Sequence, residues 1–214
     1  METVSAPHPD FAIEPVPGLP ERPPLGEELL WQGRPDALML AREAFKITWV
    51  AGYFVALAVC RAAVVADGSP ASVVAVMLPY LVIGAVACGL LYGMAVVQAR
   101  STVYTVTTAR VAMRIGAALT VTLNLPFRQI GAASLAARRN GTGTIALQTL
   151  GETRISYLVC WPHVRPWHLA RTQPALRCIP DAARVARLLA DAAETRLNEP
   201  VVARAAAGLA MAAE

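Results

Sequence analysis

The chain has 214 residues, of which 56% are hydrophobic and 16% are charged, and its formal net charge is +4. This length has room for a membrane anchor and one domain of ordinary size, but hardly for two independent soluble domains. Lys46 is the only lysine, and the other eighteen basic residues are scattered arginines without a basic run, which argues against a nucleic-acid-binding track.

The first 44 residues divide into a tail and a segment of different character. Residues 1–25 are rich in proline and cannot form a helix of useful length, and they lack the charged start and apolar core of a signal peptide. Residues 26–44 contain Leu29, Leu30 and Trp31, which suit burial or an interfacial position. We expect 26–44 to be an amphipathic docking segment, with Trp31 as a candidate partner-binding residue.

Residues 45–98 have the pattern of a transmembrane helical hairpin. The spans 45–66 and 73–97 hold about 22 and 25 residues, and at about 1.5 Å per residue each is long enough for a hydrocarbon core. A compact turn around Gly68 and Pro70 separates them. Apart from Lys46 at its start, the first span carries one charge, Arg61: either it lies near the far interface and extends toward it, or it pairs inside the membrane.

The second span carries a row of small residues. Ala85, Gly89 and Gly93 recur every four residues, a spacing that lets helices approach closely. Two interpretations remain open: this face packs within the hairpin against Gly52 and Ala56, or it binds another membrane protein or a second copy of the chain.

Basic residues near the ends of the spans predict the orientation of the hairpin. They occur before or at the start of the first span and after the second but not in the connecting turn, at Arg34, Arg42, Lys46, Arg100, Arg110 and Arg114. Because cytoplasmic flanks carry the excess of basic residues, we expect both termini to be cytoplasmic.

Residues 100–198 change to the two-residue alternation of β-strands. The segments 102–107, 110–115, 119–125, 144–149 and 154–159 predict a cytoplasmic domain of six or seven strands at hairpin spacing. Asp181 can cap a helix to Leu197, in which Val185, Leu188, Leu189 and Ala192 form one apolar stripe. Residues 199–214 form an alanine-rich tail.

The residue types needed for catalysis or metal binding are sparse. The four cysteines form no CxxC pair, no phosphate-binding GxxxxGK[ST] sequence occurs, and the histidines are His8, His163 and His168. We therefore expect no enzymatic activity, cofactor or metal. His163 and His168 are separated by five residues and a proline, which favours a structural or surface role over pigment ligation.

Four further residues are candidates for contacts at the surface of the domain. Trp161 and Trp167 lie in a proline- and tryptophan-rich stretch and could anchor a partner or sit in the headgroup layer, although packing on the sheet is the default. Arg138 and Arg139 flank a turn and could contact anionic lipid, although such a pair is usually solvated.

Together these patterns predict an α+β membrane protein: a two-helix hairpin followed by a PH-like β-barrel or sandwich that ends in an amphipathic helix. Six stretches of sequence carry a more specific resemblance to a known family. They are GEELLWQGRPD at 26–36, TVYTVTTARVAMRIG at 102–116, LNLPF at 123–127, GTGTIAL at 141–147, WPHVRPWHLAR at 161–171 and LRCIPDAAR at 176–184. With them the chain resembles the PuhB family of photosynthetic-complex assembly proteins of purple bacteria, within the bacterial PH-like group. Thr144 departs from the aspartate expected there.

The resemblance implies a non-enzymatic assembly factor in the bacterial inner (intracytoplasmic) membrane. It would bind subunits of the photosynthetic reaction centre and light-harvesting 1 complex, or other assembly factors. Composition and periodicity indicate only an anchored β domain, and such an architecture serves many functions. Two alternatives therefore stay open: a membrane-anchored lipid-binding module, and a permanent structural subunit of the complex. A homodimer also fits.

Overall fold

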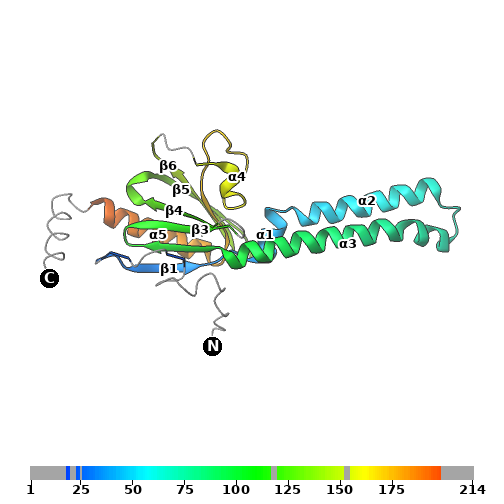
Figure 1. The fold of residues 1–214 in the computed structure, drawn as a ribbon, viewed down its shortest axis with the longest axis horizontal. Coiled ribbons are helices and arrows are strands. Elements are labelled where there is room, and N and C mark those ends of the chain that lie inside the picture. The colour runs from blue at the N-terminus through cyan, green and yellow to red at the C-terminus, as the bar shows by residue number, and fades with distance from the viewer. Residues whose placement is uncertain (1–17, 20–22, 25, 117–119, 152–154, 199–214) are drawn as a thin grey trace, which may run out of the picture. The chain divides into compact units, whose positions relative to one another are not determined.

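The computed structural model describes residues 18–19, 23–24, 26–116, 120–151 and 155–198 (Figure 1). Most of the proline-rich tail and all of the alanine-rich tail lie outside the described residues. The chain divides into two compact units, one made of residues 1–36 with 100–214 and the other of residues 37–99. The helical unit is thus inserted into the sheet domain after its first strand, which the expected boundaries at 26–44 and 100–198 did not anticipate.

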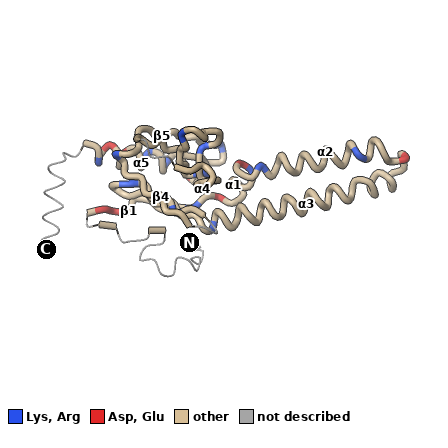
Figure 2. The backbone as a smooth tube through the Cα atoms, turned by 45° about the horizontal axis from the view of Figure 1, so that its top comes forward, with Lys and Arg blue, Asp and Glu red and all other residues tan. Residues whose placement is uncertain are grey.

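The inserted unit is helical. Helix α1 spans Ala37–Glu43, α2 spans Ile47–Val65 and α3 begins in this unit and spans Pro70–Ser101. By length and composition, α2 and α3 could each cross a membrane. Figure 2 shows how few charged residues interrupt either helix. Pro79 lies inside α3 without ending it.

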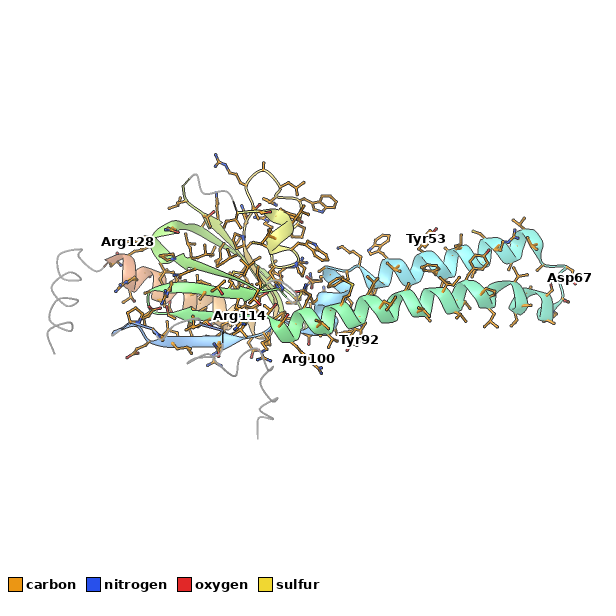
Figure 3. All side chains as sticks on the ribbon, in the orientation of Figure 1. Tyr53, Asp67, Tyr92, Arg100, Arg114 and Arg128 are labelled. Carbon is orange, nitrogen blue, oxygen red and sulfur yellow. The ribbon has the colours of Figure 1, made fainter. Side chains whose placement is uncertain are left out.

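Polar groups close the turn between α2 and α3. The Asp67 carboxylate accepts a hydrogen bond from the Ser69 backbone N–H at 2.9 Å, and Ser69 Oγ accepts one from the Ser72 N–H at 3.2 Å. Asp67 is labelled at this end of the hairpin in Figure 3. Arg61 is exposed and lies four residues before the end of α2, close to the turn.

The other unit contains two antiparallel sheets. The first has the order β1-β2-β3-β4, with strands Leu29–Gly33, Val103–Thr107, Arg110–Ile115 and Val121–Pro126. After the short helix η2 (Phe127–Gln129), the second has the order β5-β6-β7, with strands Ile130–Ala137, Gly143–Thr149 and Ala175–Ile179. Helix α4 (Tyr157–Cys160) follows β6, and α5 (Ala182–Asn198) ends the domain.

One apolar core joins both sheets to α5. Its largest buried members come from β2, β3, η2, β6 and β7, among them Tyr104, Met113, Phe127, Leu147 and Leu176. Helix α5 adds the buried side chains of Val185 and Leu189, with Leu188 and Ala192 packed at the margin, as the sequence stripe predicted. The amphipathic helix is therefore confirmed.

The docking segment is also explained by the structure. Leu29 pairs with Thr107 and Gln32 with Thr105, so β1 extends the first sheet beside β2. Gln32 Nε2 adds a hydrogen bond to Thr105 Oγ1 at 2.9 Å. The segment docks onto the chain's own sheet, across about 70 residues of inserted sequence.

Two details of the expected domain are corrected by the structure. Of the expected barrel or sandwich, the closed barrel is wrong, because the described strands form two sheets and the consecutive strands β4 and β5 belong to different ones, with η2 between them. The strand expected at 154–159 is replaced by α4, where the His163 N–H donates to the Cys160 carbonyl oxygen and turns the chain before β7. Residues 152–154 lie outside the described part of the chain.

Candidate partner-binding surfaces

Helices α2 and α3 pack against each other, and each uses a single face for this contact. The close approach occurs at Gly84, where an added Cβ would lie 2.7 Å from Phe54 Cβ. One turn later, Cys88 Sγ lies 3.9 Å from the Ile47 carbonyl oxygen. The side of α3 that faces α2 therefore contains Gly84 and Cys88.

The predicted row of small residues is turned away from α2. Successive helical residues are rotated by about 100°, so Ala85 and Gly89 point away from the line of Gly84 and Cys88. Ala85, Gly89 and Gly93 are all exposed, and among the described residues no atom lies within 4 Å of a Cβ added at Gly89 or Gly93. We call these three residues the outward stripe.

The intramolecular interpretation of this row is wrong. Gly52 and Ala56 are themselves exposed on α2, and a Cβ at Gly52 would likewise meet no described atom within 4 Å. The reason is that α2 contacts α3 through a different face, which contains Phe54 and the buried Ala58. The outward stripe is open to another helix.

In the sheet domain, a buried polar cluster centres on His163. Its ring is fully buried, with Nδ1 2.6 Å from Tyr104 Oη and Nε2 3.0 Å from Thr102 Oγ1. Tyr104 Oη also accepts a hydrogen bond from the Arg177 backbone N–H at 3.3 Å. The tyrosine proton is then directed at Nδ1, which leaves the imidazole proton on Nε2 to be donated to Thr102.

Burial controls the ionisation of this cluster. It lowers the pKa of His163 to about 3, with a further contribution from the nearby Arg177 guanidinium. Burial also raises the pKa of Tyr104 far above its usual range. Arg177 Nη1 donates to the Pro162 carbonyl oxygen at 3.0 Å. Neutral His163 thus joins β2, the segment before β7 and β7 itself.

The two histidines of the WPHVRPWHLAR stretch lie in different settings. Both ring nitrogens of His163 are engaged in the core, and His168 Nδ1 lies 2.9 Å from the Pro166 carbonyl oxygen. Within the described part of the chain, no group of three or more His, Cys, Asp or Glu residues could hold a metal ion.

Around this buried cluster, the WPHVRPWHLAR stretch and the preceding helix α4 expose large apolar side chains. Trp167 is 91% exposed, Leu158 85% and Leu169 67%, and Val159 and Trp161 are also exposed. Trp167 has a φ of 65°, a left-handed conformation that is uncommon for a residue with a side chain. We call residues 157–171 the tryptophan surface. It borders a cavity of about 870 Å³ that Tyr157, Leu169 and Arg171 help to line.

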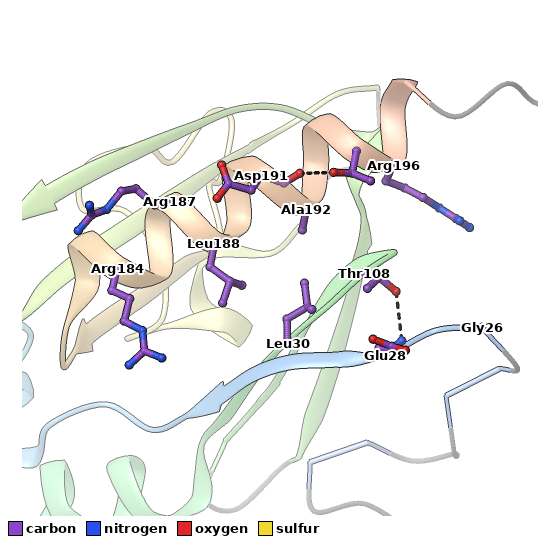
Figure 4. A pocket seen from close by; sticks show the side chains of 11 residues that line it. Gly26, Glu28, Leu30, Thr108, Arg184, Arg187, Leu188, Asp191, Ala192 and Arg196 are labelled. Carbon is purple, nitrogen blue, oxygen red and sulfur yellow. Dashed lines mark hydrogen bonds between the residues drawn. The ribbon is translucent and has the colours of Figure 1, made fainter.

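A groove of about 700 Å³ lies between β1 and α5 (Figure 4). Leu30 and Leu188 point into it from opposite sides, and the Glu28 N–H donates to Thr108 Oγ1 at its edge. Arg184, Arg187 and Asp191 place charges along it. The groove was not predicted from the sequence, because it depends on the pairing of β1 with β2. The one local signal is the alternation of Gly26, Glu28 and Leu30, which places these three residues on the same face of an extended chain.

The remaining predicted residues lie apart from these surfaces. Trp31 packs against the core, and its ring would lie 2.3 Å from a Cβ added at Gly33, so Trp31 has a structural contact within the domain. Arg138 and Arg139 are exposed at the β5–β6 turn. The Arg138 N–H donates to the Thr142 carbonyl oxygen, which holds the turn together.

Comparisons with known proteins agree with this architecture. The family model described as "Bacterial PH domain" matches residues 47–193. A protein of Rhodobacter capsulatus, described as an uncharacterized 23.7 kDa protein in the puhA 5' region, is 50% identical over 207 residues, which are 95% of this chain and 97% of the relative. No solved structure matches the chain significantly. The two-sheet domain with its C-terminal helix and inserted apolar hairpin belongs to the bacterial PH domain family.

Proposed function

We propose that this chain is a membrane-anchored, non-enzymatic assembly factor for the photosynthetic reaction centre and its light-harvesting 1 complex. The relative near the puhA photosynthesis gene region supports a role related to the reaction centre. The resemblance to the PuhB family supports the assembly role.

The membrane anchor is supported by what the two helices leave exposed. Only 11% of the most apolar stretch of α2 and 6% of that of α3 are buried, whereas a core helix of a soluble protein would be mostly buried. Exposed apolar surface on this scale marks contact with lipid or protein. With basic residues flanking both ends, the hairpin crosses the inner, intracytoplasmic membrane with both termini in the cytoplasm.

The outward stripe is the single observation that carries the binding role. In lipid, apolar side chains give helices little reason to associate, and interfaces depend on small residues that let backbones come close. Ala85, Gly89 and Gly93 offer such a surface, and the hairpin itself does not use it. A membrane helix of a reaction-centre or antenna subunit, another assembly factor or a second copy of this chain would pack there.

The test is deletion of the gene, followed by near-infrared absorption spectra of membranes. We expect less reaction-centre and antenna absorption, restored by the wild-type gene but not by a Gly89→Leu, Gly93→Leu double variant of equal abundance. Gly52→Leu is the matched control, since it adds the same bulk to the exposed face of α2. Unchanged spectra after deletion would remove the assembly role. Stoichiometric amounts of the protein in purified mature complexes would instead favour a permanent subunit.

A further inference from the structure

The tryptophan surface is tied to the point where α3 enters the sheet domain. Thr102 directly follows Ser101, the last residue of α3, and its Oγ1 lies 3.0 Å from His163 Nε2. Tyr104, two residues further, binds the other ring nitrogen at 2.6 Å. These bonds are buried, so the base of the 157–171 segment is fixed beside the first residues after the helix.

The exposed part of this segment combines aromatic, aliphatic and basic side chains. Trp167, Leu158 and Leu169 are largely exposed. From residue 153 to residue 180 the sequence has four arginines and no acidic residue. Two of them, Arg165 and Arg171, are exposed beside these apolar side chains. Tryptophan with arginine is the composition found at the boundary between lipid tails and headgroups.

We propose that the tryptophan surface is a second membrane attachment, in which Trp167 and its apolar neighbours enter the headgroup layer of the bilayer crossed by the hairpin. This inference rests on the transmembrane hairpin of the proposed function. It adds a site in the sheet domain itself that binds lipid, with a preference for anionic headgroups that comes from Arg165 and Arg171.

Chain geometry places the surface within reach of lipid. The apolar run of α3 ends at Val97, and the five residues to Thr102 add only about 7–8 Å of helical rise. Thr102 therefore lies at about headgroup level when α3 spans the bilayer. Trp167 is four residues from His163, a distance of at most about 14 Å along an extended chain. This proximity favours lipid as the occupant over a soluble protein.

The experiment uses full-length protein in vesicles of phosphatidylcholine brominated on its acyl chains, with and without phosphatidylglycerol. Single-tryptophan variants retain Trp167, Trp49 or Trp31, with phenylalanine at the other tryptophan positions. Trp49 lies in the hairpin and reports bilayer insertion, whereas Trp31 packs on the domain core and serves as the protected control. The difference in quenching between the wild type and the Trp167→Phe variant also gives the quenching of Trp167, and it leaves Trp31 in place.

We expect Trp167 to be quenched to an extent comparable with Trp49, and more strongly with phosphatidylglycerol present, while Trp31 keeps its fluorescence. Quenching of Trp49 without quenching of Trp167 would overturn the inference and leave the hairpin intact, and the surface would then face water or a protein. Loss of quenching at Trp49 as well would refute the transmembrane anchor on which both proposals depend.

Discussion

The buried imidazole of His163 predicts that the sheet domain loses stability in mild acid. In the folded protein the pKa of His163 is lowered to about 3, against 6.5 for an unperturbed histidine. As the pH falls through 6.5 the unfolded chain binds a proton at this position, whereas the folded chain does not until the pH nears 3. The contribution of neutral His163 is therefore complete above pH 6.5 and is lost progressively below it.

The size of the effect follows from these two pKa values. At pH 5 the solution is about 1.5 pH units below the histidine pKa of the unfolded state, whereas the folded state stays neutral. At about 1.4 kcal/mol per unit, the free energy of unfolding is therefore about 2 kcal/mol lower at pH 5 than at pH 8. No reduction for solvent screening applies, because the ring is fully buried.

Urea unfolding of the full-length protein in detergent, followed by tryptophan fluorescence, measures this difference at the two pH values. His163→Gln should be less stable at pH 8, by about 1–3 kcal/mol, because Tyr104 and Thr102 lose their partner. It should also lose most of the additional decrease of about 2 kcal/mol at pH 5. His168→Gln is the matched control, since His168 Nδ1 lies 2.9 Å from the Pro166 carbonyl oxygen of its own exposed segment. Equal acid-dependent losses in the two variants would refute the reasoning.

Three further predictions concern packing and charge. Gly84→Leu should separate α2 from α3, because even a Cβ would lie 2.7 Å from Phe54 Cβ, and cross-linking of cysteines placed across the helices should fall while Gly89→Leu leaves it unchanged. Leu147→Ala, in the centre of the core, should lower the free energy of unfolding by about 2–5 kcal/mol in urea titrations, and a loss below about 1 kcal/mol would contradict its burial. Glu27→Gln removes the 2.8 Å ion pair with Arg110 Nε and should cost at most about 1 kcal/mol by the same titration. High salt should reduce this difference between wild type and variant, because it screens the pair in the wild type.

The two ends of the inserted hairpin are fixed by pairing within the sheet domain. Strand β1 precedes the hairpin and β2 follows it, yet the Leu29–Thr107 and Gln32–Thr105 pairs place them side by side. A sheet with one strand on each side of an insertion holds both ends of that insertion. The connection before α1 is held in the same way, since the Asp36 N–H donates to the Cys178 carbonyl oxygen at 2.8 Å.

The sequence alone determined the features that depend on local periodicity. The uncharged run of α3, the alternation in β2, β3 and β6, and the stripe of α5 are repeats that a single helix or strand imposes on its own residues. Strand β5, with the sequence IGAASLAA, was not predicted, because small residues carry little β signal. Its pairing with β6 provides the stabilisation that its composition lacks.

Only the tertiary structure decided which surfaces remain free. Periodicity places Gly84 and Gly89 on different faces of α3 but does not say which face α2 covers, and the Phe54 contact settled that. Likewise, the WPHVRPWHLAR stretch does not reveal that His163 is buried against Thr102 and Tyr104 while Trp167 points outward. Such choices depend on contacts between residues about 30 to 60 positions apart, and a local pattern contains no information about its distant partner.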